Sequence, residues 1–153
     1  MKAILRTNPW ASAILIGILV GDVCVVRAEP RNGIELNENA FTFAAELIKE
    51  GRFIGDRKGA WSEHRPSAAE ENEFIRVHGF GEYAKWHLGI NRRFPESSKR
   101  RYKFPYGDFK NVHRCALLAV KARARQYGYA EIESAATQLR AMIEATSDEQ
   151  ARH

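Results

Sequence analysis

The sequence has few of the residue patterns that carry catalysis. It contains two cysteines, Cys24 and Cys115, and no CxxC pair, which excludes a local thiol-redox or zinc-finger motif. Its histidines show no HExxH spacing, and it has neither a glycine-rich phosphate loop nor a nucleophile elbow. These absences predict a protein with no catalytic residues, no local metal motif and no cofactor.

Scattered histidines leave one alternative open. His64, His78, His87 and His113 have no ligand spacing along the chain, but a fold can bring distant side chains together. The alternative is therefore a metal-binding protein, or an enzyme, built from these histidines and nearby carboxylates. Cys115 lies on the apolar flank of a predicted helix, which favours a buried and inert thiol.

Strand-like alternation and internal repeats are also missing. The chain has 153 residues, of which 44% are hydrophobic and 28% charged, as expected of one globular domain with a real core. Apolar residues recur instead at helical spacing. The sequence therefore predicts a mainly α protein, a small single-domain bundle of about four to five helices.

The first 28 residues have the three-part pattern of an export signal. Lys2 and Arg6 precede an apolar run over 11–21, and Val26 and Ala28 suit cleavage before Glu29. The run is too short to span a bilayer comfortably, so no stable membrane anchor is expected. The pattern predicts a periplasmic or secreted protein, and the alternative is a cytoplasmic one.

Capping and breaker residues divide the rest of the chain. Asn37 or Asn39 suits a helix start, because a short side-chain carbonyl accepts hydrogen bonds from free first-turn amides. Ser67 and Glu70 have the spacing of a capping box. The predicted segments are an irregular lead over 29–39, a helical domain over 40–145 that opens with a helix from Ala40 to Glu50, a polar connection from Arg52 to Arg65, and a flexible tail over 146–153.

Three further helices are expected after the capping box. A short one begins at Glu82 and turns its aromatic residues and His87 toward the core. Asp108 is predicted to cap a second from Phe109 to Tyr127, which Gly128 ends. The third covers Ala130 to Ala145 and buries one apolar stripe, which consists of Ile132, Ala135, Ala136, Leu139, Met142 and Ile143.

Charge is distributed unevenly along the chain. The net charge is +5, yet residues 85–125 contain twelve Lys or Arg against only Glu96 and Asp108. On the helix predicted from Phe109, four cations share one face about 22 Å long, while Arg123 falls on the apolar side. The predicted binding residues for an anionic partner are Lys99, Arg100, Arg101, Lys103, Lys110, Arg114, Lys121 and Arg125.

Two interpretations of these cations stand. Aromatic residues alternate with them in the stretch RRYKFPY, and aromatics beside cations suit phosphate contact and base stacking. The other interpretation is a solvated helix face, because a surface helix normally carries charge on its outer side.

Two stretches resemble a family of small uncharacterised bacterial proteins. They are WSEHRPSAAEENEFI with HGFGEYAKWHLGI, and RYKFPYGDFKNVHRCALLAVKARA with IESAATQL, and their most specific part is YKFPYGDF-x-x-VHR. The second stretch is more loosely similar to a short module near phage prohead-protease genes. The resemblance covers about Ala40 to Ile143 and implies a shared fold, but no activity. Family members begin near the first helix, so residues 1–28 are an addition to the family pattern.

The sequence thus favours a non-enzymatic helical protein that contacts an anionic partner through basic residues. The partner is a polyanion or an acidic protein surface, with nucleic acid as a candidate only if the protein is not exported. The alternatives are the histidine-based metal protein or enzyme, and a plain structural domain without a ligand.

Overall fold

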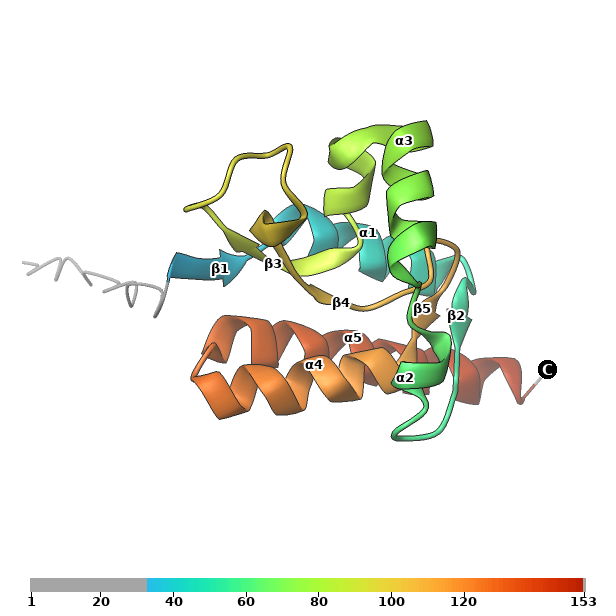
Figure 1. Cartoon of the computed structure of the whole chain (residues 1–153). Helices are drawn as coiled ribbons and strands as arrows, with labels where there is room; N and C mark the ends of the chain where they lie inside the picture. The colour runs from blue at the N-terminus through green and yellow to red at the C-terminus, as the bar shows by residue number, and fades with distance from the viewer. Residues whose placement is uncertain (1–32, 153) are drawn as a thin grey trace, which may run out of the picture.

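Helices dominate residues 33–152, which are the part of the chain that this computed structural model describes (Figure 1). The predicted signal over 1–28 lies outside this part, and so does Cys24. The elements are β1 (Ile34–Leu36), α1 (Glu38–Lys49), β2 (Phe53–Ile54), α2 (Trp61–His64), α3 (Ala68–Ala84), β3 (His87–Asn91), the 3₁₀ turn η2 (Lys99–Arg101), β4 (Tyr102–Pro105), β5 (Val112–His113), α4 (Arg114–Tyr127) and α5 (Ala130–Gln150). The predicted mainly α, single-domain class is confirmed, with a small sheet added to the five helices.

The two sheets are short. Strand β3 is the centre of an antiparallel sheet in the order β1-β3-β4, in which Ile90 pairs with Glu35 on one side and with Tyr102 on the other. Strands β2 and β5 form a two-residue parallel pair, with Ile54 opposite His113. That second pair joins the segment after α1 to the start of α4.

Helices α4 and α5 form an antiparallel hairpin that packs under the three-stranded sheet, and α1 packs against α5 (Figure 1). The apolar stripe predicted for the last helix is confirmed, except that Met142 is only partly buried. Its residues Ile132, Leu139 and Ile143 are at most 1% exposed and meet Leu117 and Leu88 in a single core. Helix α3 stands on the other side of the sheet in Figure 1.

The predicted helix caps are confirmed at three places. Asn37 Oδ1 accepts a hydrogen bond from the Ala40 amide, and Asn37 Nδ2 donates across the fold to the carbonyl of His87 at 3.0 Å. Ser67 and Glu70 form the reciprocal capping box at the start of α3. Gly128 ends α4 in the left-handed conformation, with φ of 76°.

The prediction of a helix through His87 is wrong. Gly79 has φ of 80° and ψ of 172°, which bends α3, and the helix then continues only to Ala84. Residues His87–Asn91 form the central strand β3. Four of these five residues are buried, because the strand lies between two others and under a helix layer, so its sequence shows no alternation.

The predicted start of the next helix is also wrong. Helix α4 begins at Arg114, not at Phe109, whose φ is 67°. Asp108 instead closes a turn, where its Oδ1 accepts hydrogen bonds from the amides of Lys110 and Asn111. Gly107 bridges to Val112 across this turn, and a side chain at position 107 would collide with the ring of Trp86.

Three further segments differ from the prediction. The lead expected to be irregular contains β1, and the polar connection contains β2 and the single-turn helix α2. Helix α5 continues to Gln150, beyond its predicted end at Ala145. Among the described helices, none is long and apolar enough to cross a bilayer.

Candidate functional site

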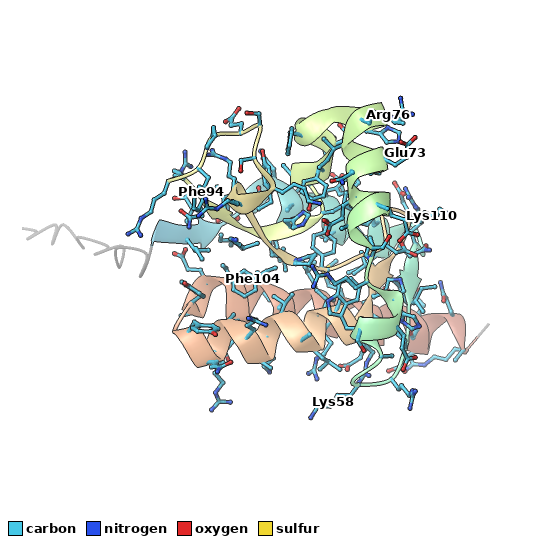
Figure 2. The ribbon with its side chains drawn as sticks, viewed as in Figure 1. Lys58, Glu73, Arg76, Phe94, Phe104 and Lys110 are labelled. Atoms are coloured by element: carbon cyan, nitrogen blue, oxygen red, sulfur yellow. The ribbon has the colours of Figure 1, made fainter. Side chains whose placement is uncertain are left out.

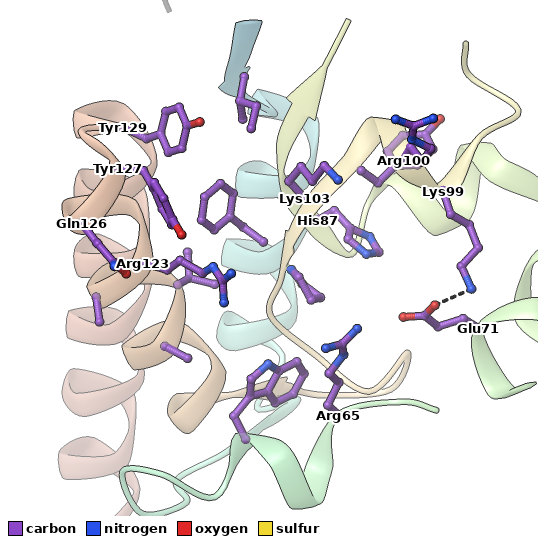
Figure 3. A pocket seen from close by; sticks show the side chains of 18 of the residues that line it. Arg65, Glu71, His87, Lys99, Arg100, Lys103, Arg123, Gln126, Tyr127 and Tyr129 are labelled. Carbon is purple, nitrogen blue, oxygen red and sulfur yellow. Dashed lines mark ion pairs between the residues drawn. The ribbon is translucent and has the colours of Figure 1, made fainter. Parts of the chain in front are cut away.

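A cleft of about 950 Å³ opens between the sheet, helix α4 and the α2–α3 segment (Figure 3). Strand β4 forms one wall with Tyr102, Lys103 and Phe104, and α4 forms the opposite wall. A volume of this order suits a small organic molecule. Five residues of the RRYKFPY stretch line the cleft: Arg100, Tyr102, Lys103, Phe104 and Pro105.

Five cations line this cleft, and they come from four different segments. The residues are Arg65 after α2, Lys99 and Arg100 of η2, Lys103 of β4 and Arg123 of α4. Glu71 is the only acidic residue among the lining residues, and it is already paired with Lys99, at 2.5 Å between Oε2 and Nζ. In Figure 3, Arg65 and Arg123 extend from their separate elements toward the same open space. The excess of positive charge therefore favours a negatively charged ligand.

The floor of the cleft is uncharged at neutral pH. His87 is 3% exposed, and burial lowers its pKa to about 4, so its imidazole is neutral. Its Nδ1 donates to the Tyr83 carbonyl at 3.0 Å, which leaves Nε2 as an acceptor. Burial and the negative charge of Glu71 raise the pKa of Tyr83, so that its hydroxyl also stays neutral.

The structure brings three of the eight predicted binding residues into the cleft: Lys99, Arg100 and Lys103. Arg100 also lies over the ring of Phe94, 4.2 Å from its centroid. Their neighbour Arg101 points elsewhere, because its side chain is 13% exposed and donates to the Phe94 carbonyl at 2.8 Å. Arg101 therefore holds the loop that precedes β4.

The predicted basic stripe is not one helical face. Lys110 lies in the turn before β5, well away from Phe104 in Figure 2. Arg114 opens α4, where it pairs with Glu144 at 3.7 Å and donates to the Asp56 carbonyl. Lys121 and Arg125 are on α4 but not among the residues that line the cleft. Their role in binding stays a prediction.

Arg65 and Arg123 line the cleft although the sequence did not predict them as candidate binding residues. Arg123 did give a signal, because it is the one cation on the apolar side of the predicted helix. In the structure its guanidinium lies 5.8 Å from the Tyr127 ring centroid, and it forms no salt bridge within residues 33–152. Arg65 gave no such signal, because it ends the segment predicted to be a polar connection.

A second group of polar side chains converges on the carboxylate of Asp56. The Nδ1 atoms of His64 and His113 each lie 2.7 Å from its Oδ2, and the thiol of Cys115 lies 3.0 Å from the same oxygen. The other oxygen, Oδ1, accepts from the Cys115 amide at 2.6 Å. We call these four residues the Asp56 cluster.

The pKa values of the two acids of this cluster shift in opposite directions, although burial raises both. Burial alone would raise the pKa of Asp56, but the hydrogen bonds from Cys115, His113 and His64 outweigh it and lower the pKa to about 2. Burial and the adjacent Asp56 carboxylate raise the pKa of the Cys115 thiol to about 12. The thiol is therefore protonated at neutral pH and is no nucleophile, in agreement with the prediction of an inert cysteine.

The four histidines of the alternative prediction do not meet at one place. Only His64 and His113 belong to the Asp56 cluster, with ring centroids 5.0 Å apart. His87 lines the cleft, and His78 packs on the ring of Phe74. Within residues 33–152 the Asp56 cluster is the group whose ligand atoms could hold a metal, since they lie within 4.8 Å of one another.

Comparison of the chain with protein-family models, with curated proteins and with solved structures finds no match. The resemblance carried by the two sequence stretches therefore stays a prediction.

Proposed function

We propose that this protein binds a small anionic ligand with an apolar or aromatic part in the cleft between β4, α4 and α2. The observation that carries the proposal is the set of five cleft-lining cations from four segments, with one paired acid among them. Cations scattered over a surface keep a protein soluble. Cations that surround one concave space favour a particular anion.

The uncharged part of the lining supports the aromatic component of the ligand. Trp61, Phe104 and Tyr127 line the cleft together with the apolar side chain of Val120. Flat side chains of this kind stack on a ring, while guanidinium groups bind carboxylate, sulfonate or phosphate by paired hydrogen bonds. The class of ligand is therefore an aromatic or nucleoside-like anion.

Localisation narrows the source of the ligand. If residues 1–28 direct export, as proposed from their pattern, the ligand is an anion of the envelope or the medium. A mature chain that starts at Glu29 supports export. A chain that keeps Met1 brings nucleotides and single-stranded nucleic acid back as candidates.

The experiment compares two double variants with the same loss of charge. Arg65→Ala/Arg123→Ala removes two cations from the cleft, and Lys121→Ala/Arg125→Ala removes two cations of α4 that do not line it. Aromatic carboxylates, aromatic sulfonates and nucleoside monophosphates are titrated as probes, with calorimetry and tryptophan fluorescence as readouts. Loss of two charge-assisted contacts is expected to weaken binding at least about tenfold.

The control variant should bind the same probe within about twofold of the native protein. Equal weakening by both variants would mean that charge acts at long range over the surface. Binding of short DNA that is lost only in Lys121→Ala/Arg125→Ala would overturn the cleft proposal in favour of the predicted helix face. A native protein that binds none of the probes would leave the structural domain as the better description.

A further inference from the structure

We propose that the Asp56 cluster is a Zn²⁺ site formed by Asp56, His64, His113 and Cys115. The proposal is independent of the anion-binding function, because none of these four residues lines the cleft. Two imidazoles, one thiolate and one carboxylate are a donor set that suits zinc, a borderline-soft ion with a preference for nitrogen and sulfur.

Three hydrogen-bond donors converge on a single oxygen of Asp56. His64, His113 and the Cys115 thiol all approach Oδ2 of Asp56, at 2.7, 2.7 and 3.0 Å. An oxygen of a carboxylate has two lone pairs, so three donors on one oxygen exceed what it accepts well. One divalent cation in place of these protons would satisfy all four side chains together.

The distances between the candidate ligand atoms are close to those of a zinc site. Metal–ligand bonds of about 2.0–2.3 Å in a tetrahedron place the ligand atoms about 3.3–3.8 Å from one another. The Cys115 Sγ atom lies 3.8 Å from His64 Nδ1, which already fits. The contacts of Asp56 Oδ2 are shorter, so zinc binding requires this carboxylate to withdraw by about half an ångström.

The surroundings of His113 also fit a metal ligand, because its Nε2 atom is buried without a hydrogen-bond partner among the described residues. That atom lies 3.3 Å from Asp108 Oδ2, a contact without hydrogen-bond geometry. A neutral imidazole carries one proton and cannot donate it to Asp56 and Asp108 at once. With zinc on Nδ1 the proton lies on Nε2 and faces Asp108, which is the usual carboxylate partner of a metal-bound histidine.

The charges of the Asp56 cluster and its access to solvent also suit a metal ion. The carboxylate of Asp56 and the thiolate of Cys115 would balance the two charges of Zn²⁺ where both side chains are largely buried. His64 is 34% exposed and lies on the outer side of the cluster, so the ion has a route in. Oδ1 of Asp56 is free to keep its hydrogen bond to the Cys115 amide and thus to cap α4, because the side chain of the N-cap residue His113 makes no capping hydrogen bond.

The test uses the full chain after treatment with a chelator, with Zn²⁺ and Co²⁺ alone as probes. One Zn²⁺ per chain is expected by calorimetry and native mass spectrometry, together with a rise in melting temperature. Co²⁺ is expected to give the intense visible bands of a tetrahedral site and a thiolate-to-cobalt charge-transfer band. Cys115→Ser should abolish the charge-transfer band.

His64→Ala is the deciding variant, because its partly exposed side chain is removed without opening the core. It should weaken Zn²⁺ binding at least about tenfold. The matched control is His78→Ala, which removes an exposed histidine outside the cluster and should leave zinc affinity unchanged. The proposal is overturned if the native protein gives no thiolate-to-cobalt band, or if His64→Ala and His78→Ala bind zinc equally well.

Discussion

His87 shows how one position combines a structural and a functional constraint. It lies in the central strand β3, hydrogen-bonds to the Tyr83 carbonyl and lines the floor of the cleft. Burial lowers its pKa to about 4, because a charged imidazole would lose its hydration there. The neutral ring is therefore compatible with the surrounding cations, whereas a charged ring would add to their repulsion.

The depressed pKa of His87 predicts that the protein loses stability in mild acid. Below about pH 6.5 the unfolded chain binds a proton at this position, while the folded protein binds it only near pH 4. Stability that is present above pH 6.5 is thus lost as the pH falls toward 4, by roughly 3 kcal/mol. Urea unfolding at steps between pH 7 and pH 4 measures this loss.

The matched variant for this measurement is His87→Gln, which keeps an amide donor but cannot titrate. It should be less stable than the native protein at pH 7 and show a flatter dependence on pH. If the two proteins lose stability in parallel as the pH falls, other groups cause the loss and His87 is not responsible.

At the scale of elements, helix α3 depends on its first turn. The side chain of Ser67 accepts from the Glu70 amide, and the side chain of Glu70 accepts from the Ser67 amide at 2.8 Å. The backbone amides of Ser67 and Glu70, which have no acceptor within the helix, each gain a hydrogen bond in this way. The helix has little else to define its start, because most of its first turn is exposed.

Ser67→Ala is expected to destabilise the protein by about 1 kcal/mol, the usual cost of losing an N-cap hydroxyl. Chemical denaturation with far-ultraviolet circular dichroism measures the change. Ser97→Ala serves as the control, because Ser97 is an exposed loop residue outside any helix. Equal stability of the two variants would show that the capping box contributes nothing to the folded state.

Local signals predicted the helices better than the strands. Asn37, Ser67 and Gly128 act through neighbours within a few residues, so their caps could be recognised from the sequence. Strand β3 has no such local cause, because it exists only between β1 and β4. The helix predicted from Phe109 failed for the same reason: the turn before β5 is fixed by distant contacts with Trp86 and Arg52.

The candidate sites show the same difference between features set by neighbouring residues and features set by distant contacts. Lys99, Arg100 and Lys103 stand together in the sequence and were predicted as one group, which the cleft keeps together. The Asp56 cluster joins a loop, a single-turn helix and the β5–α4 junction, so no spacing along the chain predicts it. From the sequence alone, His64, His78 and His113 are all candidate metal ligands. Nothing in the sequence distinguishes His64 and His113 from His78.

At the scale of the whole molecule, helix α2 connects the two sites. It contains only four residues and its N-cap makes no side-chain hydrogen bond, so it is not stable by itself. His64 ties it to Asp56 at 2.7 Å, and the ring of Trp61 packs 6.0 Å from that of His113. Trp61 and Arg65, at the two ends of the same short helix, line the cleft.

This connection predicts that His64→Ala weakens ligand binding in the cleft, although His64 does not line it. Without its tie to Asp56, α2 samples more positions, and part of the binding free energy is spent on ordering Trp61 and Arg65. The dissociation constant of an anionic aromatic probe is expected to rise about fivefold, which corresponds to about 1 kcal/mol. His78→Ala should leave it unchanged. If both variants bind the probe as the native protein does, the cleft is rigid without the Asp56 cluster and the two sites are independent.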